Sequence, residues 1–524
     1  MHRNRVIETA ISYPSSSEQS FKSWVNLSPH QILGCTDRGL TQSCSEQIQR
    51  IQEFNQNKSA LPTIFLAESS PEKFLGSFIA ATSQGCPLFL CNPKWSQMEW
   101  QQVFQLVQPD LVWGESNAQS STLTTPKFCH PFPKEYGSPI LIPTGGSSGK
   151  IRFAIHSWQT LTASVQGFQS YFQSNISPLH INSFCTLPLY HVSGLMQFLR
   201  SYFTHGKLAI FPFKHVEMGQ VPDWDFSDFF ISLVPTQLQR LLAHEQTIKW
   251  LKQFHTVFLG GAPAHSELLE RVKDHRIQLA PTYGMTETAA QVATLKPQDF
   301  LTGNYVTGKN IVGQVLPHAR IILDSQSEGN SRKELSAYSN RLKTGLITIK
   351  SDALMWGYYQ PESKWGSTEF TEKLNVFKSD DLGYFDDVGN LSIIGRNSRK
   401  IITGGENVFP AEVEAKILAT QLVQDVRVLG LPDIHWGEVI TAVYLPQSNQ
   451  SNSEPLAIET LKSELQTSLS SYKIPKLWIP VEQLPYNSQG KVNLEIVRQM
   501  AFNHEIYQNS QRHSKPENAE PENA

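Results

Sequence analysis

Short apolar runs that alternate with helix-like segments constrain the fold of this chain more than any other feature. Residues 62–66 (PTIFL), 87–91 (PLFLC) and 111–113 (LVW) have the composition of buried strands, and residues 71–80 carry apolar side chains at helical spacing. Because alternation of strand and helix favours parallel pairing, we expect an α/β fold with two mostly parallel sheets. Further strand-like runs, each separated by room for a helix, lie at 181–188, 208–213, 229–234 and 256–259.

The pattern changes in the last two fifths of the chain. From about 303 to 394, closely spaced β-type runs with Gly turns predict a smaller, barrel-like β-rich section. A polar segment then leads into a new α+β pattern. We therefore expect a large N-terminal domain over 1–396, a small, mobile α+β lid domain over 397–507, and a disordered polar tail over 508–524.

Charge and composition argue against several classes of partner. The chain has 524 residues with a net charge of -3 and only 17% charged residues, and it has no run of Lys or Arg. Nucleic-acid binding usually requires a basic patch, so we do not expect a nucleic-acid partner. No apolar run approaches the roughly 20 residues of a membrane span, and the N-terminus lacks the apolar core of a signal peptide.

The cysteines favour a reducing compartment. None of them is in C-x-x-C spacing or beside a pair of histidines, so buried thiols are expected rather than a metal site or a disulfide framework. Together with the absence of a span, this predicts a cytoplasmic protein. The six cysteines are Cys35, Cys44, Cys86, Cys91, Cys129 and Cys185.

A turn rich in Gly, Ser and Thr, residues 143–150 (PTGGSSGK), joins two strand-like runs. Such a turn can arrange backbone N–H groups, hydroxyls and a cation around phosphate oxygens, although a plain flexible hairpin has the same composition. It is not a Walker A loop, because Ile151 stands where the metal-binding hydroxyl would be. The candidate phosphate-binding residues are Thr144, Gly145, Gly146, Ser147, Ser148, Gly149 and Lys150.

Residues 283–287 (YGMTE) follow a run that we expect to end as a strand near 281. The carboxylate of Glu287 could hold Mg²⁺ against ATP phosphates, the hydroxyl of Thr286 could donate to a phosphate oxygen, and the ring of Tyr283 could stack on a base. The alternative is an ordinary helix N-terminus with Thr286 as its cap.

Two adjacent acids, Asp380 and Asp381, precede Leu-Gly-Tyr. In an extended segment successive side chains point to opposite faces, so only one of the two can face a given ligand and the other is structural. A carboxylate that accepts both ribose hydroxyls, with Arg396 reaching the same sugar, is the functional interpretation. An Asp turn and a surface Arg are the alternative.

The motifs in this order resemble the adenylate-forming superfamily of acyl- and aryl-CoA ligases, luciferases and peptide-synthetase adenylation domains. The resemblance spans roughly 140–493 and includes the segment 401–410 (IITGGENVFP) beyond the expected hinge. It implies an enzyme that uses ATP and Mg²⁺ to form an acyl-adenylate and pyrophosphate, and then transfers the acyl group to the thiol of CoA.

The resemblance also implies roles for individual residues. The loop from Thr144 to Lys150 would grip the pyrophosphate, Asp381 and Arg396 would hold the ribose, and Glu287 would bind the metal. Thr286 would contact phosphate, Ser398 would be the hinge, and Lys491 would be the catalytic lysine, which otherwise reads as a turn residue. Gly261, Ala262 and Tyr283 would frame the adenine, and Gly404 and Gly405 would face the thiol.

This chain departs from the family at two positions. The family usually has Gly where Asp380 stands, so the ribose role is assigned to Asp381, which directly precedes Leu-Gly. Many members have Asp at the hinge, where this chain has Ser398; a small polar residue can still absorb a backbone rotation.

The identity of the acid depends on residues 187–200. His191 could line the acyl pocket or the thiol tunnel, or be an ordinary core histidine, and Arg200 falls nine residues later on an otherwise apolar helix. A buried guanidinium needs a carboxylate partner, which a second carboxylate on the substrate would supply; alternatively, Arg200 could extend to solvent. The spacing resembles the branch of the family that activates an aromatic dicarboxylic acid, 2-succinylbenzoate, for menaquinone and phylloquinone biosynthesis.

Other functions remain open at this stage. Benzoate, coumarate or a medium-chain acid could be the substrate, or the protein could load a carrier protein. A non-catalytic adenylate-binding protein is disfavoured because Lys491 and Glu287 are both present. The sequence leaves the oligomeric state open, a dimer included.

Overall fold

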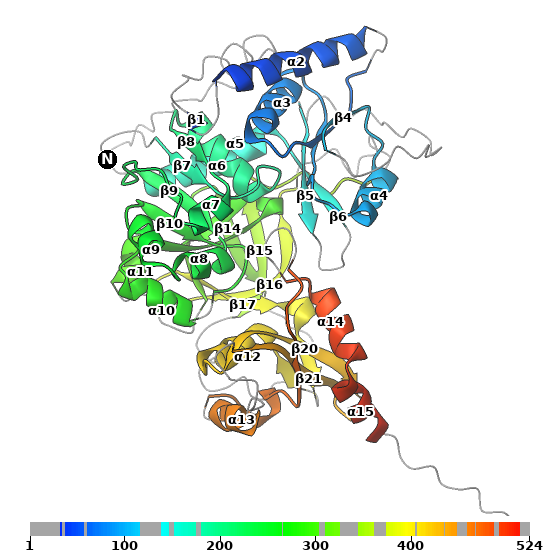
Figure 1. Cartoon of the computed structure of the whole chain (residues 1–524), viewed down its shortest axis with the longest axis vertical. Helices are drawn as coiled ribbons and strands as arrows, with labels where there is room; N and C mark the ends of the chain where they lie inside the picture. Colours follow the sequence, from blue (N-terminus) through cyan, green and yellow to red (C-terminus); the bar gives the residue numbers. More distant parts are fainter. Residues whose placement is uncertain are drawn as a thin grey trace, which may run out of the picture.

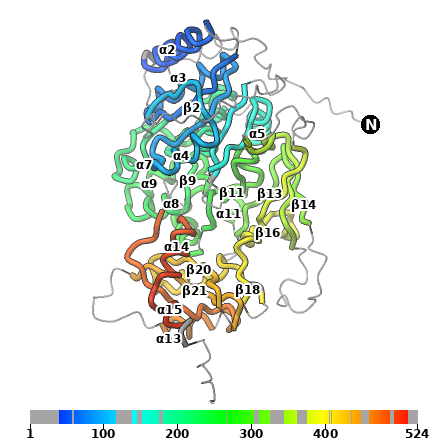
Figure 2. The backbone as a smooth tube through the Cα atoms, turned by 90° about the vertical axis from the view of Figure 1, so that its right-hand side faces the viewer, coloured from blue at the N-terminus to red at the C-terminus, as the bar shows by residue number. Residues whose placement is uncertain are grey.

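This computed structural model describes residues 32–33, 37–56, 60–115, 138–145, 151–173, 180–264, 266–302, 310–324, 344–360, 374–403, 406–433, 435–447, 458–466, 468–486 and 492–513. These residues form three sheets with helices packed against them. In both Figure 1 and Figure 2 the chain from β18 onward forms a lobe at one end of the long axis, and α2 lies at the opposite end.

The first sheet has five strands in the order β4-β2-β3-β5-β6, all parallel except β6. Its central strands β2 and β3 are buried along their whole length, which is why they read as uninterrupted apolar runs. Ser70, Ser96 and Ser157 cap three of the helices by accepting a hydrogen bond from a backbone N–H three residues later. The strands are β2 (Ile64–Ala67), β3 (Leu88–Leu90), β4 (Leu111–Gly114), β5 (Ile140–Gly145) and β6 (Ile151–His156); the helices are α2 (Asp37–Asn55), α3 (Pro71–Ser83), α4 (Gln97–Leu106) and α5 (Trp158–Phe172).

The second sheet has twelve strands, and its first half is parallel. In the order β1-β8-β7-β9-β10-β11, each strand lies beside a strand from another strand–helix unit. The core packed against these strands is rich in Phe and Trp. The strands are β1 (Ile32–Leu33), β7 (Asn182–Cys185), β8 (Leu208–Ile210), β9 (Phe229–Leu233), β10 (Thr256–Leu259) and β11 (Leu279–Met285); the helices are α6 (Val192–Phe203), α7 (Phe213–Glu217), α8 (Pro235–Leu241), α9 (Glu245–Leu251) and α10 (Ser266–Asp274).

The second half of this sheet is antiparallel, in the order β12-β13-β17-β16-β15-β14. Ladder contacts continue from β11 into β12, so the β-rich section extends the α/β sheet instead of forming a separate unit. The elements are η3 (Thr286–Thr288), β12 (Ala290–Thr294), α11 (Pro297–Leu301), β13 (Ile311–Val315), β14 (Ala319–Asp324), β15 (Gly345–Ser351), β16 (Phe377–Phe385) and β17 (Leu391–Arg396).

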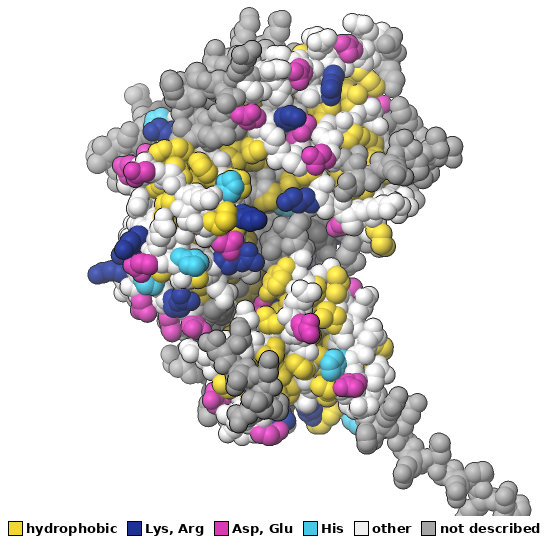
Figure 3. All heavy atoms as spheres, in the orientation of Figure 1, with side chains coloured by type: hydrophobic (Ala, Val, Ile, Leu, Met, Phe, Trp, Pro, Cys, Tyr) yellow, Lys and Arg dark blue, Asp and Glu magenta, His cyan; other side chains and the backbone are white. Residues whose placement is uncertain are grey.

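The C-terminal lobe is a five-stranded sheet with helices and its own buried cores. In the view of Figure 3 it stands apart from the larger lobe and carries yellow hydrophobic side chains on its visible face. The elements are η4 (Asn397–Arg399), β18 (Ile401–Thr403), β19 (Glu406–Val408), α12 (Pro410–Ala419), β20 (Val423–Asp433), β21 (Gly437–Pro446), α13 (Ile458–Gln466), η5 (Ser471–Lys473), β22 (Leu477–Pro480), α14 (Leu494–Asn503) and α15 (Glu505–His513).

The expected fold class is confirmed: mostly parallel sheets with helices, a β-rich section and a small α+β part at the C-terminus. The domain boundary after residue 396 stays a prediction. No helix among the described residues is long and apolar enough to cross a membrane. The four described cysteines, Cys44, Cys86, Cys91 and Cys185, are free and buried, and burial raises the pKa of Cys86 to about 12.

Two expected boundaries were wrong. β11 does not end near 281 but continues to Met285, because β12 pairs with its last residues. The polar tail does not begin at 508, because α15 runs to His513. Tyr507 anchors this helix: its ring is buried and its hydroxyl donates to the carbonyl of Pro432 at 2.8 Å. The remainder of the expected tail, 514–524, lies outside the described residues.

Candidate functional site

Asp381 and Arg396 face each other across neighbouring antiparallel strands. They are register partners in β16 and β17, and Arg396 Nε lies 3.5 Å from Asp381 Oδ1. The hydroxyl of Tyr283, from β11, donates to the other carboxylate oxygen, Oδ2, at 2.7 Å. Burial and then the charge of Asp381 raise the pKa of Tyr283 well above its usual value, so the phenol stays a donor. The structure thus brings together three residues that the sequence assigned to one nucleoside.

Asp380 faces a different partner. Its carboxylate accepts a hydrogen bond from the backbone N–H of Ser398 at 3.1 Å and another from the Ser398 hydroxyl. The alternation of side chains along β16 therefore separates the two acids as expected: Asp381 belongs to the Tyr283 cluster, and Asp380 holds the turn η4 that carries Ser398.

Glu287 is a buried carboxylate in the turn η3, and its side chain has a defined partner. The residue is 8% exposed, and its Oε1 accepts a hydrogen bond from the hydroxyl of Tyr358. The guanidinium of Arg152, on β6, lies over the Tyr358 ring at 4.1 Å from its centre. Burial and then the charge of Glu287 raise the pKa of Tyr358.

The surroundings of Glu287 fit a magnesium ion that is shared with a nucleotide. No group of three or more His, Cys, Asp or Glu side chains able to hold a metal occurs in the part of the chain that the structure describes. A single carboxylate is what Mg²⁺ typically takes from a protein when substrate phosphates and waters complete its octahedron. Mg²⁺ bound in this way supplies positive charge against the phosphates.

Thr286 is positioned by a buried histidine from the first sheet. His156 is at the end of β6, and its Nε2 lies 2.8 Å from the carbonyl oxygen of Thr286 while its Nδ1 lies 3.0 Å from Thr160 Oγ1. Burial lowers the pKa of His156 to about 4, so the ring is neutral at pH 7. The ring therefore joins the β5–β6 hairpin to the 286–288 turn.

The residues of η3 do not form the helix N-terminus considered as an alternative. Thr286 is the first residue of a single 3₁₀ turn that follows Met285, and the chain leaves it through Ala289 and Ala290, both with positive φ. Left-handed backbone at two consecutive alanines is uncommon and occurs where surrounding contacts enforce it. Ser164 supplies one such contact by donating to the carbonyl of Ala289 at 2.6 Å.

Two of the phosphate-loop candidates, Thr144 and Gly145, are the last residues of β5, directly before the connection to β6. β5 and β6 pair up to Gly145 and Ile151, Thr144 is buried, and β5 lies against η3. The strand that ends with Thr144 and Gly145 is thus in contact with the turn that carries Thr286 and Glu287. Gly146, Ser147, Ser148, Gly149 and Lys150 lie outside the described residues.

Gly261 and Ala262 follow β10. β10 pairs in parallel with β11, the strand that carries Tyr283, in a register that ends at Leu259 and Pro281. Gly261 has φ +83°, a left-handed conformation that favours glycine.

The two acid-pocket candidates bracket helix α6. His191 is its N-cap, and the rings of Tyr190 and His191 pack at 4.5 Å between centres. Arg200 is only 4% exposed, so the alternative in which it extends to solvent was wrong. Its guanidinium stacks on the ring of Phe168 at 4.0 Å, its Nε and Nη2 have no hydrogen-bond partner among the described residues, and burial lowers its pKa to about 9.

Three further expected residues cannot be placed. Gly404, Gly405 and Lys491 lie outside the described residues. Their neighbours are placed: Thr403 pairs with Glu406, and Tyr486 forms a bridge with Val492. The hydroxyl of Tyr486 donates to Asp425 at 2.6 Å, which anchors one side of the segment that carries Lys491.

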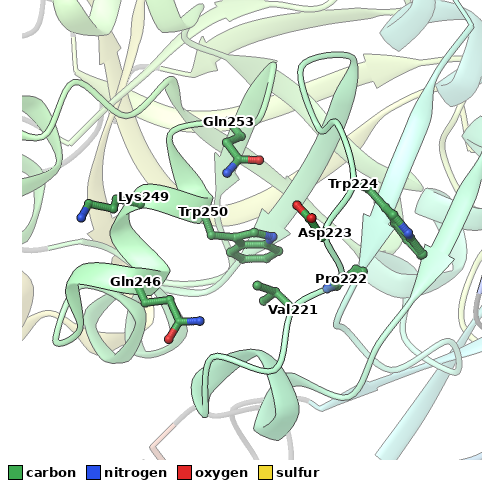
Figure 4. A pocket seen from close by; sticks show the side chains of 8 residues that line it. All are labelled: Val221, Pro222, Asp223, Trp224, Gln246, Lys249, Trp250 and Gln253. Atoms are coloured by element: carbon green, nitrogen blue, oxygen red, sulfur yellow. The ribbon is translucent and has the colours of Figure 1, made fainter.

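A pocket of about 320 Å³ lies elsewhere on the large lobe. Figure 4 shows its lining from α9 and from the loop between α7 and β9, with Trp250, Trp224 and Lys249 among its side chains. None of the residues described above lines it, so it is separate from the candidate site.

The arrangement is suited to a nucleotide-binding enzyme, because the paired Asp381 and Arg396 could hold a sugar and the buried carboxylate of Glu287 lies in a turn that contacts β5. The family models described as AMP-binding enzyme and AMP-binding enzyme C-terminal domain match residues 115–359 and 412–491. The chain therefore belongs to the AMP-binding enzyme family, which confirms the resemblance to adenylate-forming enzymes.

The relatives and solved structures agree with this assignment. The chain is 32% identical to a 2-succinylbenzoate–CoA ligase of Listeria monocytogenes over 67% of each chain, and 31% identical to one of Listeria innocua over 71% of this chain and 72% of the relative. It superposes on o-succinylbenzoate CoA synthetase of Bacillus subtilis in complex with the acyl-adenylate intermediate with a TM-score of 0.72 at 21% identity, over 91% of this chain and 97% of that one.

Proposed function

We propose that this protein is an AMP-forming CoA ligase that activates 2-succinylbenzoate for menaquinone or phylloquinone biosynthesis. The single observation that carries the choice of acid is Arg200, a guanidinium buried in the large lobe without a carboxylate partner among the described residues. Family membership and the ligases of the two Listeria species support the same class of reaction.

The described residues account for the nucleotide half of the site. Asp381 accepts the ribose hydroxyls while Tyr283 and Arg396 fix its carboxylate, and Glu287, held by Tyr358, faces the metal. Thr286 and Thr144 offer hydroxyls to phosphate oxygens. Because a carboxylate is a poor nucleophile towards a polyanion, catalysis depends on fixed positive charge and on alignment of the attacking oxygen with the α-phosphorus.

The acid half of the site extends along α6. Nine residues at 1.5 Å each place Arg200 about 13 Å along the helix from His191. An acid whose reacting carboxylate lies near His191 would present a second carboxylate towards Arg200. That pairing would supply the hydrogen bonds and the opposite charge that the buried guanidinium otherwise lacks.

The remaining roles are proposals of the same kind. Lys491 would neutralise charge in the adenylation step, and Ser398 would be the hinge about which the C-terminal lobe turns to bring Gly404 and Gly405 to the CoA thiol. A cytoplasmic location is proposed from the free cysteines. Benzoate, coumarate or a medium-chain acid remains the alternative substrate, and an acyl carrier protein the alternative acceptor.

The test is ATP- and Mg²⁺-dependent pyrophosphate release, with and without CoA, over 2-succinylbenzoate, benzoate, coumarate and octanoate. We expect release with 2-succinylbenzoate alone and a CoA thioester among the products. Release only with another acid would overturn the substrate while keeping the family. If the adenylate forms but no CoA thioester appears, the proposal that CoA is the acceptor is overturned.

Arg200→Leu provides a sharper test of the acid site. Leaving one substrate carboxylate unpaired should weaken the reaction with 2-succinylbenzoate by about 2–5 kcal/mol, with little change in the KM for ATP. Arg50→Leu, on the exposed face of α2, is the matched control and should change neither. An equal loss with a monocarboxylic acid would remove this role from Arg200.

A further inference from the structure

His318, which the sequence analysis did not single out, lies in the interior of the large lobe against Gly167, whose neighbour Phe168 stacks on the guanidinium of Arg200. It is in the connection between β13 and β14, and the hydroxyl of Ser351 donates to its carbonyl at 2.8 Å and fixes its backbone. Both ring nitrogens are buried, and neither meets hydrogen-bond geometry among the described residues; the backbone of Gln291 is near enough to act on the pKa of the ring but forms no hydrogen bond of good geometry. A buried imidazole without any such partner is unusual, because buried polar groups are nearly always hydrogen-bonded.

The fold makes room for this imidazole at one position. Gly167, on α5, has no side chain, and a Cβ there would meet His318 Nδ1 at 1.9 Å and Cγ at 2.4 Å. No side chain at 167 could coexist with the ring in this place. The histidine therefore occupies a space that the neighbouring helix leaves open for it.

The strongest charge that acts on His318 is the positive charge of Arg200, which favours an anion beside it. Burial lowers the pKa of His318 to about 4, and the positive charge of Arg200 acts in the same direction, against smaller opposite effects of Asp352 and the backbone of Gln291. A neutral imidazole retains one N–H donor. Arg200 adds Nε and Nη2, which have no hydrogen-bond partner among the described residues. A carboxylate can accept several such hydrogen bonds at once, since it has two oxygens with about four lone pairs.

We propose that His318 is a specificity-determining residue of the acid pocket, where it donates a hydrogen bond to the same second carboxylate that pairs with Arg200. This inference rests on the proposed function and deepens it: the pocket selects acids with two carboxylates through two donors from different elements, α6 and the β13–β14 connection. Phe168 covers one face of the guanidinium, so the carboxylate approaches in the plane of its nitrogens.

The experiment compares kcat/KM of the full-length wild-type enzyme and its His318→Leu and His318→Gln variants. The acids are 2-succinylbenzoate and two analogues with one carboxylate each, 4-oxo-4-phenylbutanoate and 2-butanoylbenzoate. The analogue that retains the reacting carboxylate serves as the monocarboxylic reference. We expect His318→Leu to lower kcat/KM for 2-succinylbenzoate about 10-fold to 100-fold, mainly through KM, with the reference acid and the KM for ATP within about two-fold.

His318→Gln retains an N–H donor and should recover part of the loss. Gly167→Ala, which forces the imidazole out of place without removing it, should show the same selective loss. Thr204→Val is the control: the Thr204 hydroxyl donates to the carbonyl of Arg200 at 2.7 Å and accepts from Ile181 N at 2.9 Å, so its loss weakens the same helix end outside the pocket. This control should lower Tm and leave the ratio between the two acids unchanged.

The outcomes separate this inference from the proposed function. If wild-type enzyme releases no pyrophosphate with 2-succinylbenzoate, the proposed substrate fails first. If it does, but the His318 and Gly167 variants lose activity equally with both acids, or lose none, then only the role of His318 is overturned.

Discussion

Tyr283 illustrates how one hydroxyl can set the geometry of a proposed ribose site. It approaches Asp381 from a strand 98 residues earlier in the chain and occupies the carboxylate oxygen that Arg396 leaves open. Tyr283→Phe should release that oxygen and raise the KM for ATP about 10-fold, the cost of roughly 1.5 kcal/mol for a hydrogen bond to a charged group, with kcat nearly unchanged. Steady-state kinetics with saturating acid and CoA would measure this.

Tyr171→Phe is the matched control for that experiment. Its hydroxyl donates to the carbonyl of Thr294 at 2.7 Å, so the variant loses a comparable hydrogen bond away from the ribose pair. It should leave the KM for ATP unchanged. An equal rise in the KM for ATP in both variants would show that a general loss of rigidity is responsible, and not the lost hydrogen bond to Asp381.

His156 should make the enzyme acid-sensitive. Its pKa falls from 6.5 to about 4 on folding because the ring is buried, so the unfolded chain binds the extra proton first as the pH falls. The stabilisation is fully present above about pH 6.5 and is lost as the pH falls towards about 4, with an upper size on the order of 3 kcal/mol.

The measurement is Tm of the wild type and His156→Gln between pH 4.5 and 7.5. Gln cannot titrate, so the variant should be less stable at pH 7.5 but should lose less Tm on acidification. Parallel curves for the two proteins would contradict the assignment of this acid sensitivity to His156.

At the scale of elements, the turn η4 connects the proposed ribose-binding pair, Asp381 and Arg396, to the C-terminal lobe. Asp380 accepts from both the backbone N–H and the hydroxyl of Ser398, so the side of β16 that faces away from Asp381 holds this turn. Ser398→Pro would remove that N–H and fix φ at Ser398. We expect adenylate formation to continue and thioester formation from it to fall about 100-fold or more, if the turn must rotate between the two steps.

Pyrophosphate release and CoA-thioester formation, measured separately, check this prediction. Ser398→Ala is the control, because it loses the hydroxyl but keeps the backbone N–H and free φ, and both half-reactions should stay within about three-fold. A Pro variant that retains both half-reactions would exclude Ser398 as the hinge.

Most strands could be predicted because each is a local pattern. β2, β3 and β10 are buried on both faces and stand out as apolar runs bounded by turns, whatever they pair with. The end of β11 was missed because its last residues read as a ligand motif and are strand only through their pairing with β12. The helix α15 was missed because its docking depends on Tyr507, one ring in a polar sequence.

The candidate site was predictable only in part. Asp381, Arg396, Glu287 and Thr286 belong to short motifs that can be identified without a structure. Tyr358 and His156 belong to no such motif, since their partners lie 71 and 130 residues away in the chain. Arg200 was identifiable as a charge on an apolar helix, whereas His318 became visible only through the empty space at Gly167.

At the scale of the whole molecule, Lys491 should separate the two half-reactions. If Lys491 has its proposed role of neutralising charge in the adenylation step alone, Lys491→Ala should abolish adenylate formation and spare thioester formation from pre-made adenylate. Rapid-quench assays of each half-reaction would measure this, with Lys249→Ala, from the separate pocket, as a control for loss of a cation. A parallel fall of both half-reactions would contradict an account with two lobe orientations.

The pairing of Asp381 with Arg396 has a mechanical consequence. Arg396 ends β17, and Ser398 comes two residues later. The proposed hinge of the C-terminal lobe therefore lies beside the proposed ribose contacts. In a rigid rotation, the displacement of a residue grows with its distance from the hinge axis. A rotation of the lobe that leaves the ribose contacts nearly unmoved would therefore move the far side of the lobe over a long distance. The nucleotide could thus stay bound while the C-terminal lobe turns a different surface towards it.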